Sequence, residues 1–278
     1  MRKSLFPGTT GVFCLFFIPY IITIIFNGIN TALINNKFDL EMAMPILVAG
    51  QIRENYELET IKSQTIIARS NFCQTIKEQD NLGVALGQIK KEVNEEIIYR
   101  VLKCGKYEKA VEETAGEILT CENELKQVPY HEISAGQTRD GEEVFHSKEG
   151  SYLKSVHSDV DKESKDFLNS IYINKNILPK ELKIKARDSA GYVTEILADG
   201  KVLEGESFRK GMGLTSANFT MQEIGDQIRF LCKGKGHGMG LSQYGADNMA
   251  RNGSSDEDIL EYYFPEMKIQ QIDYKFFE

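Results

Sequence analysis

The sequence predicts an α+β fold in which a helical amino-terminal layer is followed by strand-rich halves. Between residues 55 and 115, apolar residues recur at helical spacing, whereas from Glu117 onward β-branched and aromatic residues gather in short runs between turns. Helices segregated from strands along a chain are typical of α+β folds. With 278 residues and 41% hydrophobic content, the chain can bury a sizeable core in one large or two small domains.

The amino-terminal end is predicted to be a membrane anchor. Arg2 and Lys3 precede an uncharged apolar run over residues 12–26, which is marginal but adequate for the roughly 20 residues that cross a bilayer. A cleaved signal peptide is the alternative, but no small-x-small cleavage site follows Phe26, which favours an uncleaved anchor. The positive charges before the run predict a single pass, with the later residues outside the cytoplasm.

Helices are predicted in the next part of the chain. Residues 44–52, MPILVAGQI, form a short apolar run compatible with a buried strand or with the start of a helix. Residues 55–76 show helical spacing with two acids in the first turn, where the helix dipole stabilises them. The charged and amphipathic region 82–115 predicts two helices that are broken near Cys104.

Strands are predicted after these helices. Residues 117–136 indicate a strand, a polar turn that contains Asn123, and a second strand. Residues 182–213 show alternating runs again, with turns at 189–191 and 198–200. No fixed-period repeat stands out.

The stretch GKGHGMGLSQYGADNMARNG, residues 234–253, places glycine at every second position up to Gly240. A dinucleotide-binding fingerprint is poorly supported because Leu241 stands where the third glycine would be, and no Gly-Lys-Ser/Thr follows. The alternation therefore predicts a backbone that closely approaches another backbone or a ligand, as only glycine permits.

Two side chains of this stretch have alternative interpretations. His237 is either a ligand-facing side chain or a core histidine that holds the loop by hydrogen bonds, and the absence of an adjacent Ser, Cys or Asp favours the structural role. Ser242 is either a nucleophile or, with better support, the cap of a helix that ends at Asn252 and Gly253.

Composition and cysteine spacing exclude several function classes. A net charge of −8 argues against a nucleic-acid partner, since such proteins normally present a basic face. The five cysteines show no Cys-x-x-Cys pair and no Cys/His cluster, so neither a zinc site nor another metal or cofactor is expected. We expect the cysteines to be isolated buried thiols, and their spacing does not decide whether any of them form disulfides.

Three segments in a fixed order carry a family resemblance. LETIKSQTIIARSN at 58–71 is similar to a helix usually written Glu-Ala-Leu-Lys-Ala-Gln-Ala-Val-Ala-Ala-Arg-Thr, and YHEISAGQTRDGEEVF at 130–145 is similar to a His-Ser-x-Ser-Gly-Gly-x-Thr segment. The glycine-rich stretch with ILEYYFP behind it completes the pattern. Together they resemble the stage II sporulation protein D family, which is related to the amidase-enhancer protein LytB. The resemblance covers roughly Ile46 to Phe264.

The resemblance implies a lytic transglycosylase of peptidoglycan, with the strand-rich halves placed around a glycan cleft. Such enzymes cut between N-acetylmuramic acid and N-acetylglucosamine without water and leave a 1,6-anhydro end. One carboxylic acid first protonates the glycosidic oxygen and then accepts the proton of the 6-hydroxyl. The implied partners are peptidoglycan glycan strands, a cell-wall amidase and other membrane sporulation proteins.

The chain departs from the family pattern where the catalyst is expected. The family has Glu-Met-Pro before the helix, and Gln51-Ile52-Arg53 stands here instead. Glutamine cannot transfer a proton, so this chain is disabled if that glutamate is the catalyst. Glu59 is the remaining acid in the motif and the candidate catalytic residue, with a helix-dipole charge as the alternative. The zinc-binding segment of some family members has no counterpart between residues 72 and 111.

The resemblance also supplies candidate glycan-binding residues. Lys62 and Arg69 match basic residues of the family helix, and we expect them to be partly exposed, either holding carboxylates in a groove or solvated. A sugar cleft needs a few convergent polar groups of this kind. The remaining candidates are His131, Ser134, Thr138, His237, Ser242, Gln243 and Tyr244.

The sequence thus predicts a membrane anchor over residues 1–30 with a short cytoplasmic start, a spacer over 31–45, and one sporulation protein D-like domain over 46–278. Its function is predicted to be lytic cleavage of glycan strands during wall remodelling. The alternative, favoured by Gln51, is a catalytically inactive module that binds glycan or stimulates an amidase. An acidic scaffold for other wall proteins has only the net charge in its favour.

Overall fold

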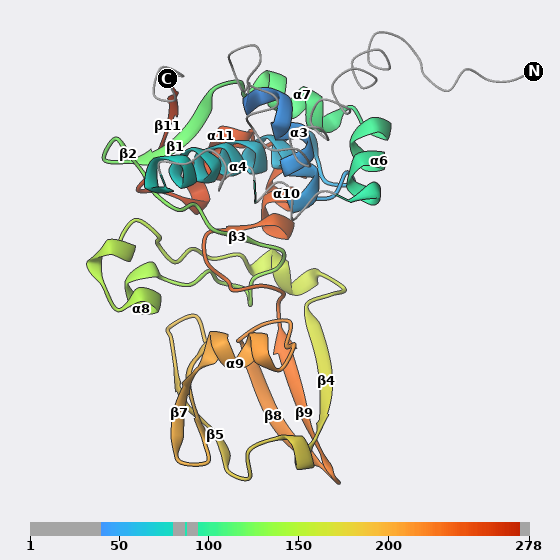
Figure 1. Cartoon of the computed structure of the whole chain (residues 1–278), viewed down its shortest axis with the longest axis vertical. Coiled ribbons are helices and arrows are strands. Elements are labelled where there is room, and N and C mark those ends of the chain that lie inside the picture. Colours follow the sequence, from blue (N-terminus) through green and yellow to red (C-terminus); the bar gives the residue numbers. More distant parts are fainter. Residues whose placement is uncertain (1–39, 80–86, 88–93, 273–278) are drawn as a thin grey trace, which may run out of the picture. The chain divides into compact units, whose positions relative to one another are not determined.

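The computed structural model describes residues 40–79, 87 and 94–272, and the chain divides into two compact units (Figure 1). Unit 1 consists of residues 1–119, 125–127 and 270–278. Unit 2 consists of residues 120–124 and 128–269, so the region predicted as one domain comprises most of both units.

Unit 1 is helical. Its described helices are α3 (Leu40–Gln51), α4 (Leu58–Gln79), α6 (Glu95–Lys103) and α7 (Lys106–Glu113). The apolar run at 44–52 is therefore helical up to Gln51, and two helices separated at Cys104 and Gly105 are confirmed for the described part of 82–115. Helix α3 begins at Leu40, within the range predicted as a spacer, and buries Ala43 and Met44.

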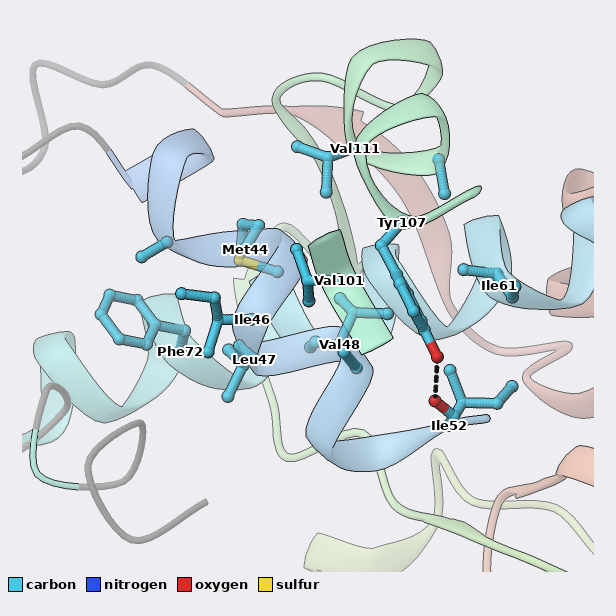
Figure 2. Packing of buried hydrophobic residues seen from close by; sticks show 14 of the residues in the cluster. Met44, Ile46, Leu47, Val48, Ile52, Ile61, Phe72, Val101, Tyr107 and Val111 are labelled. Atoms are coloured by element: carbon cyan, nitrogen blue, oxygen red, sulfur yellow. Dashed lines mark hydrogen bonds between the residues drawn. The ribbon is translucent and has the colours of Figure 1, made fainter. Parts of the chain in front are cut away.

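The core of unit 1 lies between these four helices (Figure 2). Met44 and Val48 of α3, Phe72 of α4 and Val101 of α6 are buried together. The Tyr107 hydroxyl of α7 enters the same cluster and donates a 2.9 Å hydrogen bond to the Ile52 carbonyl. This bond satisfies the polar end of a ring that is otherwise buried among apolar side chains.

A three-stranded sheet has the order β11-β1-β2. It is built from β1 (Glu117–Cys121), β2 (Glu124–Leu125) and β11 (Lys268–Gln271). Glu122 and Asn123 join β1 to β2 with φ values of 53° and 63°. Positive φ at both central residues is the geometry of a tight hairpin turn, which confirms the polar turn predicted here.

The larger strands of unit 2 form two antiparallel sheets (Figure 1). One has the order β4-β9-β8, from Leu168–Asn174, Gln227–Lys233 and Phe219–Ile224. The other has the order β5-β6-β7, from Leu182–Arg187, Val193–Ala198 and Lys201–Glu204. The predicted turn between β6 and β7 is confirmed, with positive φ at Asp199 and Gly200.

Helix α9 (Gly205–Gly211) completes the core of this part of unit 2. Phe208 of α9 packs with Phe219 and Phe230, and the ring centroids are 5.7 to 6.0 Å apart. The remaining elements are β3 (Tyr130–His131), α8 (Gly141–Phe145), the short 3-10 turns at 148–150, 159–163 and 175–177, β10 (Leu241–Ser242), α10 (Gln243–Arg251) and α11 (Asp256–Tyr263).

The α+β class is confirmed by this mixture of helices and open sheets. Among the helices of the described ranges, none has the length and apolar character needed to span a bilayer. The predicted anchor over residues 1–30 lies outside the described residues.

Candidate functional site

The second and third motif segments lie side by side within unit 2. Strands β3 and β10 pair in parallel, with Tyr130 opposite Leu241 and His131 opposite Ser242. The Ile133 amide donates to the Lys235 carbonyl at 3.0 Å, and the Arg139 amide donates to the Gly238 carbonyl at 2.8 Å. Two segments about a hundred residues apart in sequence thus form one continuous structure.

The glycine alternation serves this close packing. Gly234, Gly236, Gly238 and Gly240 all have positive φ, between 65° and 115°. A Cβ on Gly236 would lie 2.6 Å from the Cβ of His131, and one on Gly238 would lie 2.5 Å from the Tyr192 hydroxyl oxygen. The predicted close approach is confirmed, and what the glycines approach in this structure is the chain itself.

His237 is a half-buried histidine that holds the glycine-rich loop. Its Nδ1 accepts a 3.1 Å hydrogen bond from the Met239 amide, which places the proton of the neutral ring on Nε2. Burial lowers the pKa of His237 to about 4, with Arg209 and Arg139 acting in the same direction against the attraction of Glu206. These contacts support the structural role that the sequence favoured.

His131 is the motif residue with an unused polar atom. Its side chain is 4% exposed, and its Nδ1 donates to the Met239 carbonyl at 3.0 Å. Burial, with the nearby ring of His237 at 5.7 Å between centroids, lowers the pKa of His131 to about 3. The Nε2 atom is buried and has no hydrogen-bond partner among the described residues, so the neutral ring of His131 has one unused acceptor.

The serines of the two motifs gather around a buried acid, Asp161. The Ser134 amide donates to Asp161 Oδ2 at 2.7 Å. Burial raises the pKa of the Asp161 carboxyl, and hydrogen bonds from Ser134, Ser242 and Ser158 oppose that rise. Ser242 also caps α10, accepting from the Gly245 amide at 3.3 Å, which confirms the predicted cap.

Other polar residues of the motifs are also used within the protein. Thr138 is fully buried and its Oγ1 accepts from the Val156 amide at 2.9 Å. Gln243 is 3% exposed, whereas Tyr244 is half-buried and its amide donates to the Glu132 carbonyl. In this structure, Ser134, Thr138 and Ser242 are fully buried and are not presented to a ligand.

A buried ion pair that the sequence analysis missed supports the same loops. Arg139 Nε donates to Asp188 Oδ2 at 2.6 Å, and the two side chains are 5% and 1% exposed. The guanidinium carbon lies 5.1 Å from the ring centroid of Tyr192. The Tyr192 hydroxyl accepts from the Ala135 amide at 2.9 Å. These contacts join the turn after β5 to the second motif.

The candidate acid of unit 1 lies in an ion pair. Glu59 stands in the first turn of α4 with its side chain 32% exposed, and its Oε2 is 3.0 Å from Lys62 Nζ. Lys62 is 15% exposed and also lies 3.8 Å from Glu113.

Gln51 is the last residue of α3. Its side-chain oxygen accepts a 2.8 Å hydrogen bond from the amide nitrogen of Gln64, which is fully buried on α4. An amide at position 51 is thus held by a neutral donor, and it has no proton to transfer to a glycosidic oxygen.

Arg69 corrects the expectation of a partly exposed charge. Its side chain is completely buried. Nε and an Nη donate to the two oxygens of Glu41 at 2.8 and 2.7 Å, and the other Nη donates to the Glu117 carbonyl at 3.0 Å. Arg69 therefore ties α4 to α3 and β1, since a two-point Arg–carboxylate pair is geometrically specific.

Comparison with known proteins agrees with the motifs. Residues 29–121 match the family described as stage II sporulation protein. The chain is 28% identical to stage II sporulation protein D of Bacillus subtilis (strain 168) over 251 residues, which covers 82% of this chain and 73% of that protein. The protein of the same name from Bacillus amyloliquefaciens is also 28% identical over the same shares of both chains.

The chain thus resembles the stage II sporulation protein D family over most of its length. An uncharacterized protein of Brachyspira hyodysenteriae (strain ATCC 49526 / WA1) is 25% identical over 90% of this chain and 69% of that relative. The resemblance stated from the three motifs is thus confirmed.

The candidate residues fall into two groups. Glu59, Lys62 and Arg69 belong to unit 1, with Gln51. The others belong to unit 2. The residues that the sequence analysis missed are Asp161, Arg139, Asp188 and Tyr192, and no spacing signal marks Asp161 in SDVDKES.

Proposed function

We propose that this protein recognises peptidoglycan glycan strands without cutting them. The observation that carries the proposal is the amide of Gln51 at the position where the family has a glutamate, held by Gln64 at 2.8 Å. A lytic transglycosylase needs a carboxylic acid to protonate the leaving oxygen, and an amide cannot replace it.

Glu59 is poorly suited to take over that role. A general acid must deliver a proton to the glycosidic oxygen, whereas the Glu59 carboxylate is already engaged in an ion pair with Lys62 at 3.0 Å. The first-turn position offers a sufficient structural reason for an acid there, because the helix dipole stabilises it.

An active lytic transglycosylase with Glu59 as its single acid is the second candidate. It is supported by the exposure of the Glu59 side chain, which at 32% is accessible to a ligand. Such an enzyme would release 1,6-anhydro ends from glycan.

The cellular setting is part of the same proposal. The names of the two Bacillus relatives support a role in sporulation. Arg2 and Lys3 before an apolar run support a single membrane pass with the two units outside the cytoplasm. A cell-wall amidase that the protein stimulates, and other membrane sporulation proteins, are the proposed partners.

The test compares the wild-type protein with Gln51→Glu on peptide-free glycan strands. We expect the wild type to sediment with the strands and to release no 1,6-anhydro ends by mass spectrometry. Release by the wild type that Glu59→Gln abolishes would establish the second candidate, and absence of binding would refute both. Release only by Gln51→Glu would assign the lost chemistry to position 51.

A further inference from the structure

Strand β4 lies at one edge of the β4-β9-β8 sheet (Figure 1). The Lys175 amide donates to the Asp226 carbonyl at 2.8 Å, and the Gly234 amide donates to the Phe167 carbonyl at 2.7 Å, so these two bonds flank the β4–β9 ladder. Antiparallel strands exchange hydrogen bonds at every second residue, and the odd-numbered residues of β4 therefore bond to β9. The even-numbered residues direct their amides and carbonyls away from β9, to a side of the strand named the free edge. Within the described ranges, no hydrogen bond reaches the backbone groups of Leu168, Ser170 and Tyr172 there.

The free edge lacks the features that usually protect an edge strand. Natural edge strands are very short, or they carry charges, prolines or bulges. The seven residues of β4, LNSIYIN, include no charge and no proline, and their register with β9 is continuous. Leu168 and Tyr172 are 56% and 52% exposed, although both side chains are largely apolar. Strand β4 is therefore open to pairing with a further strand.

The other edges of the two larger sheets of unit 2 are protected. Strand β5 reads LKIKAR, and its register shifts on both sides of Ala186. Strand β7 has four residues, KVLE, which begin and end with a charge. Strand β8 carries Glu223, and its Phe219 carbonyl accepts from a terminal nitrogen of Arg187 at 2.6 Å. Of these four edges, β4 is thus the one that has neither charge nor irregularity.

A second β4 is the strand that suits the free edge. Two copies related by a two-fold axis use one surface twice, so they need no separate recognition site. The partner strand must also present even-numbered residues, because only those have backbone groups at its free edge. The antiparallel register that overlaps all seven residues meets this condition. It places Ser170 opposite Tyr172 of the second copy, and Ile171 opposite its own counterpart.

This register is favourable in side chains and in charge. Tyr172 lies diagonal to Leu168 and to Tyr172 of the second copy, and aromatic rings reach such diagonal neighbours. The pairing forms about six to eight backbone hydrogen bonds, within the range of about ten that a standard interface carries. Copies of a chain with a net charge of −8 repel one another, but β4 brings no charge against its copy.

We propose that the free edge of β4 joins two copies of this chain into a two-fold symmetric dimer. The three-stranded sheets of the two copies then form one continuous sheet. Because two strands bury less than the about 1,600 Å² of a standard interface, the dimer is weak, with a Kd of about 1 to 100 µM. This inference goes beyond glycan recognition and does not depend on it.

The first test is sedimentation equilibrium of the full chain in detergent, with two variants at one position. Ser170→Pro removes an amide of the free edge and leaves the β4–β9 ladder intact, since proline is tolerated on an edge strand where its nitrogen faces outward. Ser170→Ala is the matched control, because it loses the same hydroxyl and keeps the amide. We expect Ser170→Pro to raise the dimer Kd at least roughly fivefold, as for two lost hydrogen bonds, and Ser170→Ala to change it less than about threefold.

The second test examines the register with single cysteines. Opposed residues that exchange no hydrogen bonds have Cα atoms about 4.5 Å apart, which a disulfide can bridge. Ile171→Cys should therefore form a disulfide with its counterpart when copper phenanthroline and oxygen oxidise the thiols, and mass spectrometry identifies the linked peptides. Ile173→Cys is the matched control, since Ile173 packs against the same core as Ile171. It lies opposite Asn169 of the second copy and roughly 14 Å from its own counterpart, so it should not cross-link.

The opposite results would overturn the inference. A wild-type chain that stays monomeric up to about 0.5 mM, well above the expected Kd, leaves the free edge to a strand of a different protein. A dimer that Ser170→Pro does not weaken is formed by another part of the chain. Equal cross-linking of Ile171→Cys and Ile173→Cys excludes the proposed register. Circular dichroism and hydrogen exchange of the β9 amides check that the sheet of each variant is intact.

Discussion

Replacing Gly238 by alanine is predicted to destabilise unit 2 through two separable effects. Gly238 has φ of 80°, and a Cβ there would lie 2.5 Å from the hydroxyl oxygen of the fully buried Tyr192. The left-handed backbone costs an alanine about 1–2 kcal/mol. Overpacking costs typically about 1–3 kcal/mol, so the sum is about 2–5 kcal/mol of unfolding free energy.

The chain provides a control that carries only the first effect. Gly253, after α10, has φ of 95°, and a Cβ there would meet nothing within 4 Å. Gly253→Ala should therefore cost about 1–2 kcal/mol, for backbone strain alone. Lys235→Ala, which removes an exposed ion pair with Glu132, should cost less than about 1 kcal/mol.

Urea unfolding of the three variants, followed by tyrosine fluorescence and circular dichroism, measures the differences. The excess of Gly238→Ala over Gly253→Ala reports the contact with Tyr192. Equal losses for the two glycine variants would refute the close-approach explanation, because strain would then account for everything. Gly238→Val should lower the unfolding free energy more than Gly238→Ala does, since a β-branched side chain is more restricted in conformation.

Three further predictions concern buried groups and the candidate acid. Arg69→Leu should lower the unfolding free energy by about 3–5 kcal/mol, because it leaves Glu41 without its two-point partner, and urea midpoints measure this. Unfolding free energy should fall as pH drops from about 6.5 toward about 3, since unfolded His131 binds a proton that the folded ring, with its lowered pKa, does not. His131→Asn should flatten that slope, and an unchanged pH profile would contradict the assignment. Glu59→Gln should leave sedimentation with peptide-free glycan within a few fold, because only a proton and a surface charge pair are lost.

Several elements of the fold could be predicted from local signals in the sequence. The turn at Asn123, the helix that begins in front of Glu59 and the cap at Ser242 each follow from the chemistry of a few neighbouring residues, and each is present in the structure. Arg69 could not be placed in this way. Its burial depends on Glu41, which lies 28 positions earlier and follows a stretch with no readable pattern.

Asp161 shows the same limit at the candidate site. Nothing around it in sequence distinguishes it from a surface acid next to a lysine. It becomes central only because folding brings Ser134, Ser158 and Ser242 to one carboxylate. A buried acid needs such donors to remain stable, and donors from three separate segments leave no spacing that could be recognised in advance.

The contacts of the motif residues in unit 2 therefore account for local structure and do not by themselves indicate a reaction. Ser134 and Ser242 bond to Asp161, and the glycines around His237 make room for neighbouring backbone and rings. These requirements hold whether or not the protein cuts glycan, so the presence of the motifs does not argue for catalysis. Cleavage depends on an acid that can deliver a proton, and the residue at the family position is Gln51, bonded to an amide. The proposed function is therefore recognition of glycan by a protein that has a glutamine where the family pattern has that acid.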